Sequence, residues 1–83
     1  MKNNIKTNKN TNYNAAHWNI VIGTFTSPTA TLAPVNENSD TPIGKLRLFI
    51  DRNNNQWTVC RGDKQKKGSG FIPSPKLASK LLG

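Results

Sequence analysis

The chain has few of the residues that stabilise a small protein through disulfide bonds or a bound metal ion. Its 83 residues include a single cysteine, Cys60, and a single histidine, His17. One cysteine cannot close an intrachain disulfide, and one cysteine with one histidine cannot complete a four-ligand zinc site. We therefore expect no metal and no cofactor, and we expect packing, self-association or a bound partner to supply the stability.

Long apolar runs and catalytic groupings are also missing. No stretch is long enough to cross a bilayer or to serve as an export signal, so we expect no membrane partner. With one cysteine, this predicts a location inside the cell (cytoplasm or nucleoid) or inside a virion. No acidic or nucleophilic residue is spaced from His17 as in a known catalytic motif, and Asp51 and Asp63 are typical turn residues. We predict that the protein is not an enzyme.

Acidic residues are scarce, with 4 Asp and Glu against 12 Lys and Arg and a net charge of +8. The excess is concentrated after residue 44, where two acids stand against nine basic residues: Lys45, Arg47, Arg52, Arg61, Lys64, Lys66, Lys67, Lys76 and Lys80. Charge concentrated in this way attracts polyanions.

Residues 1–14 hold six asparagines and three lysines and very little apolar surface. Such a composition predicts a disordered arm. Two interpretations stay open: a basic tail that folds onto nucleic acid or a partner, and a leader without a role. Residues 15–83 are predicted to form a single small β-rich domain.

Apolar residues alternate through Trp18, Ile20 and Ile22, which predicts a strand. The strand either continues or bends at Pro28 and resumes over residues 29–32. The polar stretch between Pro34 and Pro42 is predicted to be an exposed loop.

Residues 44–62 predict a β-hairpin around the turn at residues 52–55, with Asp51 opposite Gln56. This register puts Ile50 opposite Trp57 and Leu48 opposite Val59 on one apolar face that would form the core. The other face would then present Lys45, Arg47, Phe49, Thr58 and Cys60.

Residues 62–70, GDKQKKGSG, are predicted to be a flexible basic loop. Ser74 and Pro75 then give a helix start signal, and Leu77 and Leu81, with Ala78 and Leu82 beside them, are predicted to form the apolar side of that helix. The expected fold is mostly β, of the α+β class: an antiparallel sheet from about Trp18 to Ile72 and a short C-terminal helix.

Cations beside aromatic side chains favour binding of nucleic acid, single-stranded more than duplex and without sequence specificity. Phe49 is predicted to stack on a base. The phosphates are predicted to lie on Lys45, Arg47, Lys64, Lys66 and Lys67. The alternative is a small structural or accessory protein of a virion or ribonucleoprotein, and a small inhibitor of another protein also fits the size. DNA or RNA as ligand, the biological process and a host or viral origin stay open.

Residues 43–82 resemble the positive cofactor four family of transcriptional coactivators, which bind single-stranded DNA. The matching segments are Ile43 to Arg47, the hairpin to Arg61, Lys66 to Gly68 as a basic turn, and Phe71 to Pro75 before a helix. The resemblance implies a curved antiparallel sheet backed by a helix, dimerisation, and single strands bound across the sheet. It implies a DNA-contacting role for Lys45, Arg47, Lys66 and Lys67.

A homo-oligomer, with a dimer as the first expectation, follows independently from the small core. Few large apolar residues are available, and a sheet of this kind leaves edges that must be paired or covered.

Overall fold

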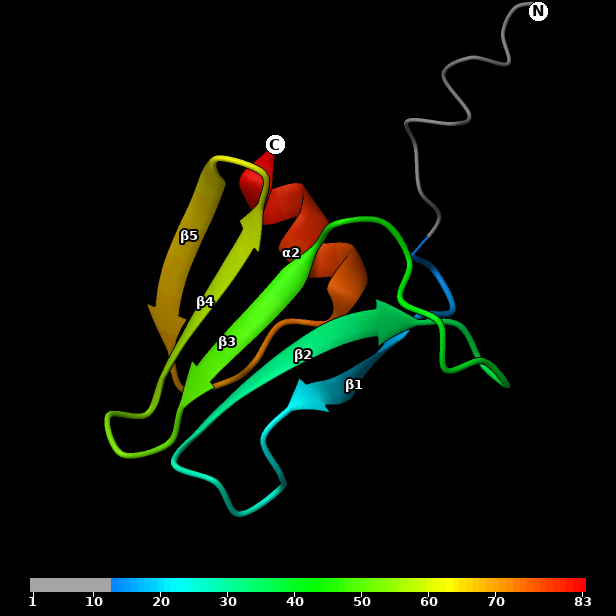
Figure 1. The fold of residues 1–83 in the computed structure, drawn as a ribbon. Helices are drawn as coiled ribbons and strands as arrows, with labels where there is room; N and C mark the ends of the chain where they lie inside the picture. The colour runs from blue at the N-terminus through cyan, green and yellow to red at the C-terminus, as the bar shows by residue number, and fades with distance from the viewer. Residues whose placement is uncertain (1–12) are drawn as a thin grey trace, which may run out of the picture.

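The computed structural model describes residues 13–83, which form one antiparallel sheet backed by one helix (Figure 1). The strands lie side by side in chain order: β1 (His17–Ile22), β2 (Thr29–Val35), β3 (Arg47–Asp51), β4 (Gln56–Arg61) and β5 (Lys64–Ser69). The helix, α2 (Pro75–Leu82), lies behind the sheet and packs mainly against β4 and β5. The prediction of a mostly β fold with a short C-terminal helix is confirmed.

The β3–β4 hairpin has the predicted register. Asp51 pairs with Gln56, Ile50 with Trp57, and Leu48 with Val59. The Asp51 carboxylate accepts hydrogen bonds from the backbone N–H groups of Asn53 and Asn54, which fixes the turn locally. The face that carries the pairs Leu48–Val59 and Ile50–Trp57 is therefore apolar and packs inward.

The core lies between this apolar face and α2. Leu46, Leu48 and Val59 are fully buried, and Trp57 packs partly buried against them. The other buried members of the cluster are Tyr13, Ala30 from β2, Ile50 from β3, and Ala78 and Leu82 from α2. Tyr13 belongs to the predicted arm, and the residues before it lie outside the described part of the chain.

The start of the helix is as predicted, and its packed side is as predicted only in part. The Ser74 hydroxyl accepts a hydrogen bond from the Leu77 backbone N–H, and Pro75 occupies the first turn. The buried residues are Pro75, Ala78 and Leu82, while Leu77 and Leu81 remain 47% and 39% exposed. The prediction is therefore confirmed for Ala78 and Leu82 and wrong for Leu77 and Leu81, because the helix turns Ala78 to the sheet.

Both tryptophans hold the connection between β5 and α2. The Trp57 indole N–H donates to the Phe71 carbonyl at 3.0 Å, and the Trp18 indole N–H donates to the Pro73 carbonyl at 2.8 Å. The connection therefore crosses the sheet from β4 toward β1 before α2 begins.

The predicted basic loop at residues 62–70 is instead mostly the strand β5, so that prediction is wrong. Arg61 pairs with Lys64 around a two-residue turn, where Gly62 has a φ of +66° that favours glycine. Further along, Gly68 pairs with Trp57, and a Cβ atom on Gly68 would collide with the indole ring. The glycine lets the ring lie on the strand, and this contact helps to hold a segment that has no apolar residue of its own.

The first strand departs from the predicted alternation at its end. The register of β1 against β2 shifts between Ile20 and Ile22, so Ile22 pairs with Thr31 and is 65% exposed. Ile22 is therefore not a core residue as its spacing suggested. The predicted loop at residues 34–42 is shorter than expected, because β2 extends to Val35.

Candidate functional site

The face of the sheet opposite α2 is not covered by the helix and is called the open face here. Strand pairing arranges its side chains in rows that run across the strands. The central row is Lys67, Thr58, Phe49 and Thr31; the flanking rows are Ser69, Gln56, Asp51 and Thr29, and Gln65, Cys60 and Arg47. The open face is thus mainly hydroxyl and amide, with one aromatic side chain near its middle.

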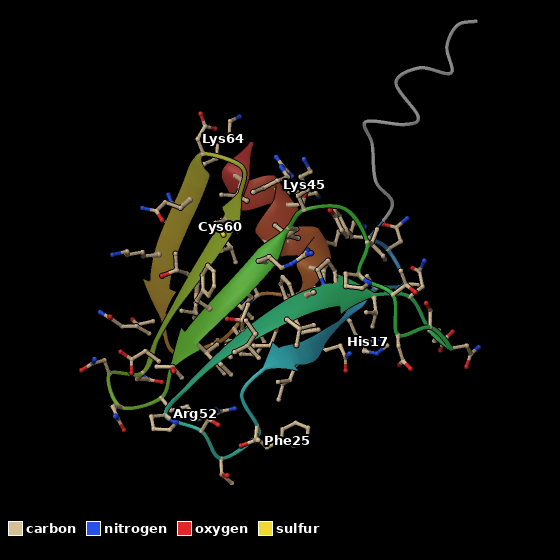
Figure 2. All side chains as sticks on the ribbon, in the orientation of Figure 1. His17, Phe25, Lys45, Arg52, Cys60 and Lys64 are labelled. Atoms are coloured by element: carbon tan, nitrogen blue, oxygen red, sulfur yellow. The ribbon has the colours of Figure 1, made fainter. Side chains whose placement is uncertain are left out.

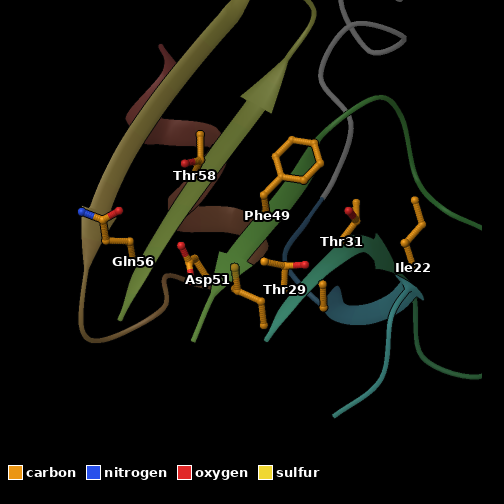
Figure 3. Close-up of a pocket in the computed structure, with 9 residues that line it drawn as sticks. Ile22, Thr29, Thr31, Phe49, Asp51, Gln56 and Thr58 are labelled. Carbon is orange, nitrogen blue, oxygen red and sulfur yellow. The ribbon is translucent and has the colours of Figure 1, made fainter. Parts of the chain in front are cut away.

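A groove of about 320 Å³ crosses this face and contains Phe49. Figure 3 shows the Phe49 ring with Thr58 on one side and Thr31 on the other, and with Asp51 and Gln56 along the groove. Phe49 is 44% exposed, although it sits in the middle strand. A half-exposed aromatic ring flanked by hydroxyl groups offers a flat apolar contact with hydrogen-bonding groups at its sides.

The cation nearest to Phe49 along the chain is partly engaged. Nη1 of Arg47 donates to the backbone carbonyls of Leu46 at 2.7 Å and Gly44 at 3.1 Å. The other guanidinium nitrogens make no hydrogen bond within residues 13–83. The backbone therefore fixes the direction of the Arg47 side chain and leaves donors for an anion.

The predicted site residues separate into three groups. Arg47, Phe49 and Lys67 share the open face, as the pairings of β3, β4 and β5 require. Lys64 and Lys66 lie on the side of β5 opposite to Lys67, because side chains alternate along a strand and Lys66 pairs with the buried Val59. The structure therefore does not bring Lys66 to the face that holds Phe49.

Lys45 forms the third group. It is exposed and lies in a turn just before β3 begins, at the same end of the sheet as Lys64 (Figure 2). The expectation that Lys45 belongs to the strand face is wrong, because β3 starts only at Arg47. Its ammonium group is available at the rim of the sheet.

Two arginines that contribute to the charge excess have structural partners. Arg61 donates to the Ser79 hydroxyl at 2.9 Å and to the Gly83 carbonyl at 3.2 Å, and so ties β4 to the end of α2. Arg52 donates to the carbonyls of Thr24 and Ser27 and joins the β3–β4 turn to the β1–β2 turn. These two guanidinium groups stabilise the fold.

The sequence interpretation missed the polar residues that line the groove. Thr29 and Thr31 on β2, and Gln56 on β4, alternate with buried or partly buried residues. That alternation was the available signal, and it gains meaning only once β2 is paired with β3.

Other kinds of site find no support in the described part of the chain. Residues 13–83 contain no group of three or more His, Cys, Asp or Glu side chains placed to hold a metal ion. No helix within the same residues is long and apolar enough to cross a membrane. Comparison with protein-family models, with characterised proteins and with solved structures finds no match for this chain.

Proposed function

We propose that the protein binds single-stranded nucleic acid, without sequence specificity, on the open face. The observation that carries the proposal is the half-exposed ring of Phe49 in a polar groove, with Arg47 and Lys67 on the same face. An unpaired base gains about 1–3 kcal/mol by stacking on such a ring. Duplex bases are already stacked on one another, so the ring favours a single strand.

The sheet geometry sets the spacing between stacking and charge. Lys67 and Phe49 belong to the same row and are separated by one intervening strand, β4. Neighbouring strands lie about 4.8 Å apart, so the backbones of Lys67 and Phe49, two strands apart, are separated by about 10 Å. A long lysine side chain spans much of that distance, so a phosphate attached to the stacked nucleotide lies within reach of its ammonium group.

The groove walls explain why no sequence preference is proposed. Thr31, Thr58 and Gln56 carry short or flexible side chains that both donate and accept hydrogen bonds. Such groups accept any base edge, whereas base-specific recognition needs rigid bidentate pairs.

The test of stacking is fluorescence anisotropy with labelled oligonucleotides, single-stranded and duplex, at low salt. Phe49→Ala is expected to weaken single-strand binding by about 5- to 150-fold, which is the 1–3 kcal/mol of one stacked base. Phe71→Ala is the matched control, because Phe71 is 89% exposed but lies in the connection to α2. Equal losses in both variants, or no binding by the unaltered protein, would contradict the proposal.

Two neighbouring lysines test the proposed face separately. Lys67 points to the open face and Lys66 to the other side of β5, yet they have the same charge and both are exposed. Lys67→Ala is expected to make the slope of log affinity against log salt shallower by the amount that about one phosphate contact contributes. Lys66→Ala is expected to change the slope clearly less. A larger effect of Lys66→Ala would move the binding surface to the helix side.

A further inference from the structure

The two edges of the sheet differ in charge. The β5 edge carries Lys64, Lys66 and Lys67, a common way to prevent strand-to-strand association. The β1 edge, His17–Ile22, has no Lys, Arg, Asp or Glu, and within residues 13–83 no other strand covers it. The backbone donors and acceptors of β1 that point away from β2 are therefore available to another strand.

The described part of the chain before Lys45 also has the fewest positive side chains that would repel a second copy. Residues 13–44 contain Glu37 and Asp40 and no lysine or arginine. A second copy carries the same +8 charge, so it meets the least repulsion where it approaches this half of the molecule. The exposed Leu77 and Leu81 are less favourable for such an approach, because Lys76 and Lys80 lie on the same short helix.

Exposed apolar side chains also lie at this edge and in the turn that follows it. Val21, Ile22 and Phe25 are 44%, 65% and 84% exposed. Beside them, on the side of the sheet that faces α2, is an apolar depression of about 360 Å³ lined chiefly by Trp18, Ile20, Phe25 and Leu32. Figure 2 shows Phe25 on the β1–β2 turn, away from the helix.

We infer that β1 is a homodimer interface, at which two copies pair antiparallel about a two-fold axis perpendicular to the sheet. The irregularity at Val21 ends regular pairing, so His17 to Ile20 are the residues that pair. This arrangement brings the two apolar depressions together on one side. On the other side it joins both open faces into one ten-stranded surface with two copies of Phe49.

The proposed interface does not depend on what the open face binds. Dimerisation and polyanion binding can be told apart because they are expected to respond to salt in opposite directions. Screening weakens the repulsion between two cationic copies, so dimerisation is expected to strengthen as salt rises. Binding of a polyanion is expected to weaken over the same range. A dimer that dissociates as salt rises would overturn the inference.

The test is sedimentation equilibrium over a range of micromolar concentrations, without nucleic acid. The unaltered protein is expected to be a dimer, and Val21→Lys is expected to raise the dissociation constant at least tenfold. Phe71→Lys, which also replaces an exposed apolar residue by lysine, is the matched control and is expected to leave it unchanged. A folded monomer throughout, or dissociation by Leu81→Asp with no effect of Val21→Lys, would overturn the inference.

Hydrogen exchange tests the interface without any substitution. On raising the protein concentration, the backbone amides of residues 17–20 are expected to gain protection, and those of β5 are not. Concentration-dependent protection confined to β5 or α2 would overturn the inference.

Discussion

Neighbouring residues of β3 face opposite sides of the sheet and meet opposite environments. Leu48 is fully buried beneath the helix-covered face, whereas the next residue, Phe49, is 44% exposed on the open face. On the covered side the positions of β3 and β4 are Leu, Ile, Trp and Val, with Arg61 at the end of β4; on the open side they are Arg, Phe, Asp, Gln, Thr and Cys. The same two strands thus supply a core with one set of positions and a largely polar surface with the other.

The contrast shows that exposure of Phe49 is not needed for the fold. A phenylalanine in the middle strand of a five-stranded sheet is ordinarily buried by a second layer, and here α2 covers only the other side. A single exposed apolar side chain is common on protein surfaces, so the proposed role of Phe49 rests on its position in the groove. The following substitutions test how far the two faces are independent.

Leu48→Ala is expected to have the largest effect, because it opens a cavity in the fully packed side. Such substitutions cost about 2–5 kcal/mol of unfolding free energy, measured here by urea denaturation. Phe49→Ala removes more side-chain volume but is expected to cost clearly less, since its ring is half in solvent. Equal losses from the two substitutions would mean that the faces are not distinct.

Gly68→Ala is expected to cause the next largest loss of unfolding free energy. It tests the covered face where that face ends, at the edge strand β5. The new methyl group would overlap the Trp57 ring, so the ring must move, at a cost of about 1–3 kcal/mol. In a Trp57→Leu background the same substitution is expected to cost much less, which a double-mutant cycle by thermal unfolding would show. Additive effects would indicate that the ring does not lie on Gly68.

Ser74→Ala is expected to have the smallest effect, because it weakens the helix that covers one face without touching either face. Loss of the cap at the start of α2 costs about 1 kcal/mol. Ser74→Asn keeps a capping oxygen and is expected to restore most of the loss in the unfolding midpoint. If oligonucleotide affinity falls in Ser74→Ala while the protein remains folded, the two faces are coupled.

Sequence pattern was sufficient where apolar residues alternate around a clear turn. The β3–β4 register followed from matching Leu48 with Val59 and Ile50 with Trp57, and the helix start followed from Ser74 and Pro75. In both places the local signal and the tertiary packing agree, which makes such predictions dependable.

Prediction failed where packing overrides local composition. KQKKGS has no apolar residue, and it becomes β5 because β4 offers an edge and Trp57 rests on Gly68. That one error placed Lys64, Lys66 and Lys67 together, when alternation along a strand divides them. Likewise, the apolar side of α2 was predicted from Leu77 and Leu81 with Ala78 and Leu82 beside them, but the spacing could not reveal that α2 turns Ala78 to the sheet and leaves the two larger leucines, Leu77 and Leu81, partly exposed.

The positions of the two tryptophans give the molecule a spectroscopic reporter of its own. Both indoles donate hydrogen bonds to the connection before α2, and neither lies in the groove of the open face. Occupation of that groove is expected to leave the emission maximum unchanged, while release of the connection shifts it to the red. In a Trp57→Phe variant the remaining indole, Trp18, lies in the edge strand, so its quenching by acrylamide would report assembly at that edge as long as the connection stays in place.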